Sequence, residues 1–249
     1  MNKSEEAEGP TSGGETCVEP GVLYLVSTPI GNLEDITLRA LNVLKEVDLV
    51  AAEDTRHTGI LLKHYHLQKR LISYHDFNKR RKAPLLIKQL KANQSVAVTS
   101  DAGTPGISDP GYFLVQLAIQ ENIKVVPVPG ASAFLSALVI SGLPTDRFAF
   151  EGFLPAKPGK RRKRLEELQE EERTLIFYES PHRFAKTLDD ISEILGQRKM
   201  VVARELTKKF EEIIRGTPEE IRKILKERKL KGELVVLIEG KSKVKDKLI

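Results

Sequence analysis

Two short segments place carboxylates beside an arginine at the ends of apolar runs. Glu53 and Asp54 precede Arg56 directly after the run at 49–52, and Glu179 precedes Arg183 after the run at 174–178. Carboxylates in such positions can orient a substrate or remove a proton from it. The same residues can instead cap a helix and form an internal ion pair. The spacing alone leaves both interpretations open.

The loop at 100–111 is the most constrained segment of the chain. It contains three glycines, two prolines and two aspartates between an apolar run and a predicted helix. Glycines let the backbone approach a ligand, prolines stiffen the path, and a carboxylate at a strand end can accept hydrogen bonds. This composition predicts a binding role for Ser100, Asp101, Ala102, Gly103 and Thr104.

Two further loops also lie between a predicted strand and a predicted helix. Ligands of open α/β sheets lie beyond the carboxyl ends of the strands, so both loops are placed to bind one. An ordinary turn, or close packing of a helix on a sheet, are the alternatives. The candidate residues of the two loops are Thr28, Pro29, Gly31 and Asn32, and then Pro129, Gly130, Ala131, Ser132 and Ala133.

The elements that position these loops alternate along the chain. Strands are predicted at 22–27, 49–52, 96–99, 124–128, 147–150, 174–178, 200–203 and 234–238. Helices are predicted at 37–47, 83–92, 112–121, 132–141, 184–195 and 217–228. Most of the strands are continuously apolar, which is typical of strands covered on both faces. The pattern predicts an α/β protein, with two α/β domains, largely parallel sheets and a ligand in the cleft between them.

The predicted domain boundaries follow changes in composition. Residues 1–20 are rich in Glu, Gly, Ser and Thr and are expected to form a disordered tail. An N-terminal domain is predicted at 21–128, a linker and helix at 129–144, and a C-terminal domain at 145–240. A basic tail is predicted at 241–249.

The overall composition fits a soluble protein and permits an anionic partner without requiring one. The 249 residues are 40% hydrophobic and carry a net charge of +5. The one cysteine, Cys17, rules out an intrachain disulfide and a thiolate metal cluster, and a reducing cytoplasm is expected. No metal site, signal peptide or membrane span is predicted. The chain lacks both the G-x-G-x-x-G fingerprint and a Walker A sequence, which argues against a dinucleotide or nucleotide enzyme.

Taken together, five segments resemble the signatures of a known family. They are Leu25-Val26-Ser27-Thr28-Pro29-Ile30-Gly31-Asn32-Leu33, Ala52-Glu53-Asp54-Thr55-Arg56, Ser100-Asp101-Ala102-Gly103-Thr104-Pro105 with Ser108-Asp109-Pro110-Gly111, Pro129-Gly130-Ala131-Ser132-Ala133 and Tyr178-Glu179-Ser180-Pro181-His182-Arg183. The chain is similar over about 22–240 to the small-subunit ribosomal RNA methyltransferase I family of the tetrapyrrole methylase superfamily.

This resemblance implies a function. It implies S-adenosylmethionine in the interdomain cleft, lined by the three loops, in a protein that is usually a homodimer. The expected product is a 2′-O-methylated cytidine in 16S rRNA near the decoding centre. The first loop departs from the G-x-G-P-G-D type of tetrapyrrole-directed members, which argues against a tetrapyrrole substrate. A small-molecule methyltransferase of the tetrapyrrole type is the alternative. A non-catalytic ribosome-binding factor is a second alternative.

The proposed reaction assigns roles to charged residues. A ribose hydroxyl is a poor nucleophile at neutral pH, so Glu53, Asp54 and Asp101 are candidates for the general base. Cations are expected to contact RNA phosphates, and six of them fall between 157 and 164. Glutamates follow this run, so a solvated helix with internal ion pairs is the alternative. The candidate RNA contacts are Arg56, Lys157, Lys160, Arg161, Arg162, Lys163 and Arg164.

Overall fold

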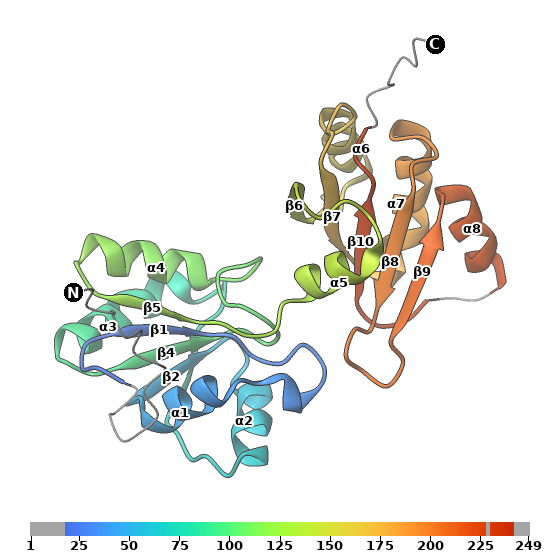
Figure 1. Cartoon of the computed structure of the whole chain (residues 1–249). Coiled ribbons are helices and arrows are strands. Elements are labelled where there is room, and N and C mark those ends of the chain that lie inside the picture. Colours follow the sequence, from blue (N-terminus) through green and yellow to red (C-terminus); the bar gives the residue numbers. More distant parts are fainter. Residues whose placement is uncertain (1–17, 228–229, 242–249) are drawn as a thin grey trace, which may run out of the picture.

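The computed structural model describes residues 18–227 and 230–241. It forms two lobes, each built around a five-stranded sheet with helices packed on it (Figure 1). The chain completes the first sheet before it enters the second. None of the helices in the described part of the chain combines the length and apolarity needed to cross a bilayer.

The first sheet is entirely parallel, in the order β3-β2-β4-β1-β5. Its strands are β1 (Leu23–Val26), β2 (Leu49–Ala52), β3 (Leu71–Ser73), β4 (Val96–Thr99) and β5 (Val125–Val128). One face is covered by α1 (Leu38–Glu46) and α2 (Thr55–His64), the other by α3 (Lys79–Lys91) and α4 (Gly111–Gln120). β1 and β4 are neighbours, and the chain leaves β1 toward one edge and β4 toward the other. This topological switch is where α/β sheets bind ligands.

The second sheet is mixed, in the order β6-β7-β10-β8-β9. Its strands are β6 (Phe148–Phe153), β7 (Thr174–Glu179), β8 (Met200–Arg204), β9 (Glu212–Gly216) and β10 (Leu234–Ile238). Only β6 and β7 pair in parallel; β10 runs antiparallel to both β7 and β8, and β9 runs antiparallel to β8. The helices α6 (Pro158–Glu167), α7 (Pro181–Ile194) and α8 (Pro218–Glu227) contribute to the core on one face.

The helix α5 (Ala133–Ser141) links the two lobes. It follows β5 of the first sheet but packs on the second, where Ala137 and Leu138 are buried against β7, β8 and β10. Figure 1 shows it lying against the second lobe, opposite α7 and α8. The helix that joins the two sheets therefore packs its apolar face on the second sheet.

The predicted fold class, two α/β units, is confirmed, and each predicted strand and helix is present. Strand direction in the second sheet differs from the expected parallel arrangement, because the β8–β9 hairpin and the antiparallel β10 occupy one side of it. The elements that the pattern did not predict are β3, β9, α2 and the 3-10 helix η1 (Leu33–Asp35). The basic run at 157–164 provides the N-cap and the first part of α6, in agreement with the alternative interpretation that it forms a helix.

The chain ends differ in part from the two predicted tails. Val18 packs against the core of the first lobe and Glu19 pairs with Lys124 at 2.6 Å, so 18–20 are not a free tail. The rest of that predicted tail, with Cys17, lies outside the described residues. Lys241 pairs with Glu170 at 2.6 Å, and 242–249 of the predicted basic tail also lie outside the described residues.

Candidate active site

The loops after β1 and β4 are joined to each other by backbone hydrogen bonds. The amide of Thr28 donates to the carbonyl of Gly103 at 2.9 Å, and the amide of Gly103 donates to the carbonyl of Thr28 at 3.0 Å. The buried Thr28 hydroxyl donates to the Ser100 carbonyl at 3.1 Å. Two of the three predicted loops therefore form one rigid unit at the switch point of the first sheet.

The third predicted loop is packed against this unit. A Cβ atom on Gly130 would lie 2.8 Å from the Cβ of Ser27, closer than side chains tolerate, so the position requires glycine. The Ser27 and Thr104 hydroxyl groups are 2.9 Å apart and share a hydrogen bond. The sequence prediction that the three loops lie together is supported by these contacts.

A cavity of about 540 Å³ opens between the two lobes, and we call it the first cavity. Its volume lies in the range of roughly 300–1,000 Å³ typical of small-molecule sites. It is bounded by the ends of β2, β4, β6 and β7 and by the start of β10. Its lining comprises Ile30, Glu53, Ser100, Asp101, Ala102, Gly103, Thr104, Ile107, Ser108, Asp109, Ser132, Ala133, Phe153, Tyr178, Glu179, Ser180, Pro181, Ala203, Leu206, Gly232, Glu233, Leu234 and Val235.

The first cavity is acidic, although the chain as a whole is basic. Its described lining carries five carboxylate side chains and no lysine, arginine or histidine. Burial raises the pKa of Glu53, and the nearby charges of Asp101 and Asp109 raise it further, while the Asp101 amide opposes the shift. Burial likewise raises the pKa of Asp109. Clustered carboxylates of this kind favour a cationic ligand, because a positive charge stabilises their ionised forms.

A second cavity, of about 390 Å³, lies against the first. The two share Ile30, Ser100, Asp101, Ala102 and Glu233 as a common wall. The remaining lining of the second cavity comes from the β1 loop, from α2 and from one residue of the second lobe: Thr28, Pro29, Gly31, Leu33, His57, Thr58, Ile60, Leu61 and Lys208.

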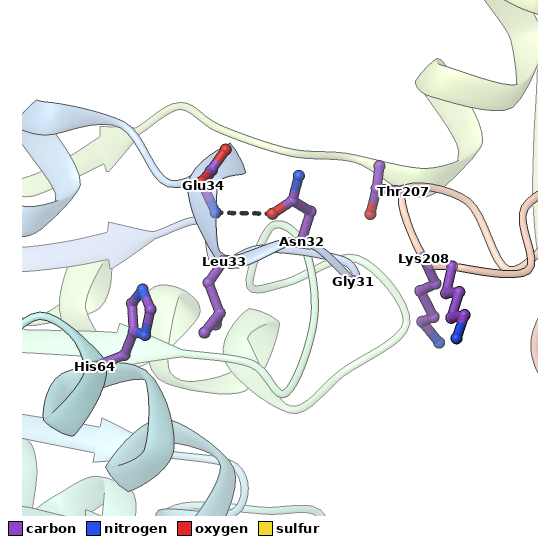
Figure 2. A pocket seen from close by; sticks show the side chains of 8 residues that line it. Gly31, Asn32, Leu33, Glu34, His64, Thr207 and Lys208 are labelled. Carbon is purple, nitrogen blue, oxygen red and sulfur yellow. Dashed lines mark hydrogen bonds between the residues drawn. The ribbon is translucent and has the colours of Figure 1, made fainter.

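The two lobes also touch beside the second cavity, at a pocket next to the β1 loop. Figure 2 shows Gly31 and Asn32 of the first lobe facing Thr207 and Lys208 of the second. A Cβ atom on Gly31 would lie 2.9 Å from the Leu206 carbonyl and 2.4 Å from the Lys208 Cγ atom. The absence of a side chain at Gly31 therefore lets the two lobes approach each other here.

The three predicted general-base candidates lie in different environments. Asp101 lines both cavities, and Glu53 lines the first. The Asp54 carboxylate lines neither; it accepts the Arg56 amide at 2.8 Å as the cap of α2 and pairs with the Arg56 side chain at 2.5 Å. Those hydrogen bonds hold the pKa of Asp54 well below its usual value. The structure gives Asp54 the capping role, so it does not fit the predicted catalytic one.

The predicted cofactor residues divide between the two cavities. The first cavity receives residues from the β4 loop, together with Ser132 and Ala133. Pro129, Gly130 and Ala131 are absent from its described lining. Gly130 packs against Ser27, and the Ala131 carbonyl accepts a hydrogen bond from the Thr104 hydroxyl of the β4 loop. Thr28, Pro29 and Gly31 line the second cavity instead, and Asn32 caps η1 by accepting the Glu34 amide at 3.1 Å. Of this loop only Ile30 reaches the first cavity, and the contact of Thr28, Pro29, Gly31 and Asn32 with the cofactor stays a prediction.

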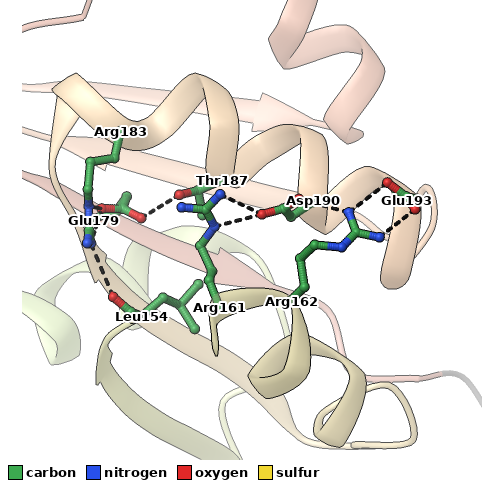
Figure 3. A network of polar contacts seen from close by, with 8 residues as sticks. All are labelled: Leu154, Arg161, Arg162, Glu179, Arg183, Thr187, Asp190 and Glu193. Carbon is green, nitrogen blue, oxygen red and sulfur yellow. Dashed lines mark hydrogen bonds and ion pairs between the residues drawn. The ribbon is translucent and has the colours of Figure 1, made fainter. Parts of the chain in front are cut away.

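The segment at the end of β7 is held by a polar network. The buried Glu179 carboxylate accepts hydrogen bonds from Arg183 at 2.6 Å and from the Thr187 hydroxyl at 2.6 Å (Figure 3). Glu179 lines the first cavity, but both of its oxygen atoms are engaged within the second lobe. The alternative interpretation of this segment, an internal ion pair, is therefore correct for Arg183, which pairs with Glu179.

The basic run on α6 separates into paired and unpaired side chains. Arg161 is only 3% exposed and donates to Asp190 at 2.7 Å (Figure 3). Arg162 pairs with Asp190 and Glu193, and Arg164 with Glu151 and Glu167. The prediction that Arg161 contacts RNA is therefore wrong for this conformation, because its guanidinium is buried in an ion pair. Lys157, Lys160 and Lys163 are exposed and form no ion pair with the described residues.

Several residues of the second lobe that line the cavities, unlike Glu179, were not among the residues singled out from the sequence. Gly232 and Glu233 precede β10. Because β10 runs antiparallel to β7, its start lies beside the end of β7; in a parallel pair it would lie at the opposite edge of the sheet. Lys208 lies in the β8–β9 hairpin, which the pattern did not predict. The apolar run of β10 was visible in the sequence; its direction was not.

Comparison with known proteins agrees with this architecture. The family model of tetrapyrrole (corrin/porphyrin) methylases matches residues 22–239. A protein of Pasteurella multocida named ribosomal RNA small subunit methyltransferase I is 54% identical over 90% of this chain and 80% of its own. A relative of the same name from Halalkalibacterium halodurans is 53% identical over 89% of this chain and 77% of its own.

Solved structures share the fold at low sequence identity. Diphthine synthase superposes with a TM-score of 0.66 at 14% identity, over 89% of this chain and 90% of its own. Uroporphyrin-III C-methyl transferase from Thermus thermophilus, complexed with S-adenyl homocysteine, has a TM-score of 0.59 at 19% identity, over 87% and 96%. This chain belongs to the tetrapyrrole (corrin/porphyrin) methylase family and, within it, to the group of ribosomal RNA small subunit methyltransferase I proteins.

Proposed function

We propose that the protein transfers the methyl group of S-adenosylmethionine to the 2′-hydroxyl of a cytidine in the 16S rRNA of the small ribosomal subunit. The observation that carries this proposal is the 54% identity, over 90% of this chain, to a relative named ribosomal RNA small subunit methyltransferase I. The acidic first cavity supports it independently, because its charge suits a cationic cofactor.

The residues of the first cavity fit S-adenosylmethionine. Its five carboxylate residues complement the sulfonium and ammonium charges, and apolar side chains such as Ile30, Phe153 and Leu206 offer a surface for the adenine ring. Carboxylates can also accept hydrogen bonds from ribose hydroxyl groups. When bound, the cofactor supplies an electrophilic methyl group, so the protein contributes mainly orientation and electrostatics.

Within this proposal Asp101 is the general base that accepts the proton of the acceptor hydroxyl. Its carboxylate lines both cavities, and Oδ1 accepts the Asp54 amide at 2.9 Å. The described residues provide no hydrogen-bond partner for Oδ2, which leaves that atom able to accept from a substrate. Glu53 fixes the backbone of Asp101 and is the positioning residue.

The proposal includes RNA contact by exposed cations. Arg56 is 86% exposed at its side chain, at the start of α2 beside the second cavity. Lys157 is the N-cap of α6, and Lys160 and Lys163 lie three residues apart within the helix, so the latter two side chains are neighbours. Arg162 and Arg164 are part-exposed and could exchange an internal carboxylate for a phosphate.

The proposal further includes action in the cytoplasm, where ribosomes assemble, as a homodimer. The apolar side chains of Leu135, Val139 and Ile140 are exposed on α5, and a second copy of the chain would cover them. Sedimentation equilibrium tests this part: a monomer at micromolar concentration would contradict it.

The experiment that tests the function is transfer of labelled methyl groups. The purified protein is incubated with methyl-tritiated S-adenosylmethionine and small subunits that lack the modification. The label is then mapped by nuclease digestion and mass spectrometry. Label on one cytidine ribose is the expected result, and fully modified subunits are the control. Cofactor binding without label on subunits or on free 16S rRNA would contradict the proposal, and tetrapyrrole acceptors would be tested next.

A further inference from the structure

We propose that the second cavity receives the target nucleotide, turned out of the RNA, with its ribose facing Asp101 at the wall shared with the first cavity. This inference rests on the proposed function and deepens it, because it assigns the acceptor to a separate pocket. The ligand class is a single pyrimidine nucleotide rather than a helical stretch of RNA.

The shared wall is the first support. Methyl transfer requires the acceptor oxygen, the methyl carbon and the sulfur to be held in line at near-attack distance. Two ligands meet this requirement only if their pockets are contiguous. The second cavity shares Ile30, Ser100, Asp101, Ala102 and Glu233 with the first, so a ligand in each would meet at Asp101.

The charge of the second cavity is the second support. Lys208 and His57 line it together with the carboxylates of Asp101 and Glu233, whereas the described lining of the first cavity contains no basic side chain. The Lys208 ammonium lies 3.1 Å from Glu233 and 3.0 Å from Glu205. Burial alone would lower the pKa of Lys208, but hydrogen bonds to Glu205 and Glu233 outweigh it and the pKa is raised. The ammonium thus stays protonated, and a nucleotide phosphate can take the place of one of these carboxylates as its partner.

The apolar lining is the third support. Pro29, Leu33 and Leu61 line the cavity together with Ile60, which is 62% exposed on α2. An aliphatic side chain left in solvent beside charged groups offers a surface for the flat face of a base. The volume of about 390 Å³ suits one nucleotide. Single-stranded RNA can be bound with its bases splayed out, and enzymes that modify a base turn it out of the helix in the same way.

The rigidity of the β1 loop is the fourth support. Thr28 is fixed to the β4 loop by two backbone hydrogen bonds, and Gly31 packs against the Thr207–Lys208 segment of the second lobe (Figure 2). A preorganised wall reduces the cost of ordering the pocket when the nucleotide enters. This wall explains why the β1 loop is constrained although only Ile30 of it reaches the first cavity.

Cysteine protection tests the inference without measuring activity. Cys17, the one native cysteine, is replaced by serine, and Ile60→Cys is introduced. Lys63→Cys is the matched control, because it is exposed on the same helix but lines none of the described cavities. Unmodified small subunits are added together with S-adenosylhomocysteine, and alkylation is followed by mass spectrometry.

The expected result is loss of alkylation at residue 60 while residue 63 still reacts. S-adenosylhomocysteine alone should leave both positions reactive. Equal protection of the two positions, or protection of neither, would overturn the inference, because a nucleotide in the second cavity must shield residue 60 specifically.

Kinetics provide the second readout. We expect Ile60→Ala to lower kcat/KM for unmodified small subunits roughly tenfold, the scale of losing a few methyl groups from an apolar pocket. Its cofactor dissociation constant should stay at the wild-type value. Ile119→Ala is the control, because Ile119 is 63% exposed on α4, away from the cavities. Wild-type kcat/KM in Ile60→Ala would overturn the acceptor pocket while the proposed function stands. Absence of RNA label in the wild-type protein would instead remove the proposed function itself.

Discussion

The Glu53 carboxylate accepts a hydrogen bond from the backbone amide of Asp101, with 3.1 Å between Oε2 and N. In return, the Asp101 carboxylate accepts the amide of the residue after Glu53 at 2.9 Å. The ends of β2 and β4 are thereby tied by reciprocal hydrogen bonds. The arrangement fixes Asp101 at the wall between the cavities, where the proposed reaction needs a proton acceptor.

Replacing Asp101 by asparagine should separate charge from position. Asparagine keeps an oxygen for the Asp54 amide but cannot take up a proton, so kcat should fall by about 10²- to 10⁴-fold. Asp101→Ala should in addition weaken cofactor binding, because a carboxylate leaves the first cavity. Single-turnover methylation and calorimetry measure the two effects. Asp54→Asn is the control, and a comparable fall in its kcat would show that capping of α2, not proton transfer, limits the reaction.

Replacing Glu53 by glutamine should change how stability depends on pH. Since the pKa of Glu53 is raised in the folded protein, the folded state binds its proton more tightly than the unfolded state does. The free energy of unfolding therefore decreases as pH rises from the unfolded pKa through the folded pKa. Glutamine removes that decrease, so Glu53→Gln should gain stability relative to wild type between mildly acidic and neutral pH. Urea unfolding across this range checks it, with the exposed Glu46→Gln as control for the same charge change; parallel curves for both would refute the prediction.

Much of the fold and part of the site could be predicted from sequence, for physical reasons that differ between elements. The buried strands β2, β4 and β10 are continuously apolar, so their limits were predicted to the residue. The edge strand β9 reads Glu-Ile-Ile-Arg-Gly and is half-exposed, so its composition does not separate it from a loop. Hydrophobic pattern identifies a strand by its burial and carries no information about its direction.

The basic run shows a second limit. Its six cations look alike in the sequence, yet Arg161 is buried against Asp190, a residue 29 positions away. Only the packing of α6 on α7 reveals that pairing. In the same way, the local sequence does not indicate that most of the β1 loop lines the second cavity, although this loop is hydrogen-bonded to the β4 loop of the first cavity.

Cofactor affinity should depend on pH through the carboxyl groups of the first cavity. The pKa values of Glu53 and Asp109 are raised, and a bound cation favours their ionised forms. Affinity for S-adenosylmethionine should therefore decrease as pH falls through the range in which these groups take up protons. S-adenosylhomocysteine lacks the sulfonium charge and should lose less affinity. Calorimetry with both ligands checks this, and equal pH dependence would show that the carboxylates do not sense the sulfonium.

The contact between the lobes at Gly31 should tolerate no side chain. In Gly31→Ala the new methyl group would lie 2.9 Å from the Leu206 carbonyl, so the β8–β9 hairpin must shift. Overpacking of this kind costs about 1–3 kcal/mol of unfolding free energy. Gly159→Ala on α6 has no atom within 4 Å of the new Cβ and should instead stabilise the protein slightly. Thermal unfolding compares the two, and unchanged stability in Gly31→Ala would mean that the lobes do not meet there in solution.

The exposed lysines at the N-cap and within α6 should set the salt dependence of RNA binding. Replacing Lys157, Lys160 and Lys163 with alanine removes three potential phosphate contacts. For single-stranded RNA each contact contributes about 0.7 to the slope of log affinity against log salt, so the slope should become shallower by about 2. The control replaces Lys45, Lys88 and Lys226, which are exposed on other helices, and makes the same change in net charge. Filter binding to unmodified small subunits across a salt series measures both slopes. If the two triple variants shift the slope equally, α6 acts only through the overall charge of the protein and is not a specific RNA contact.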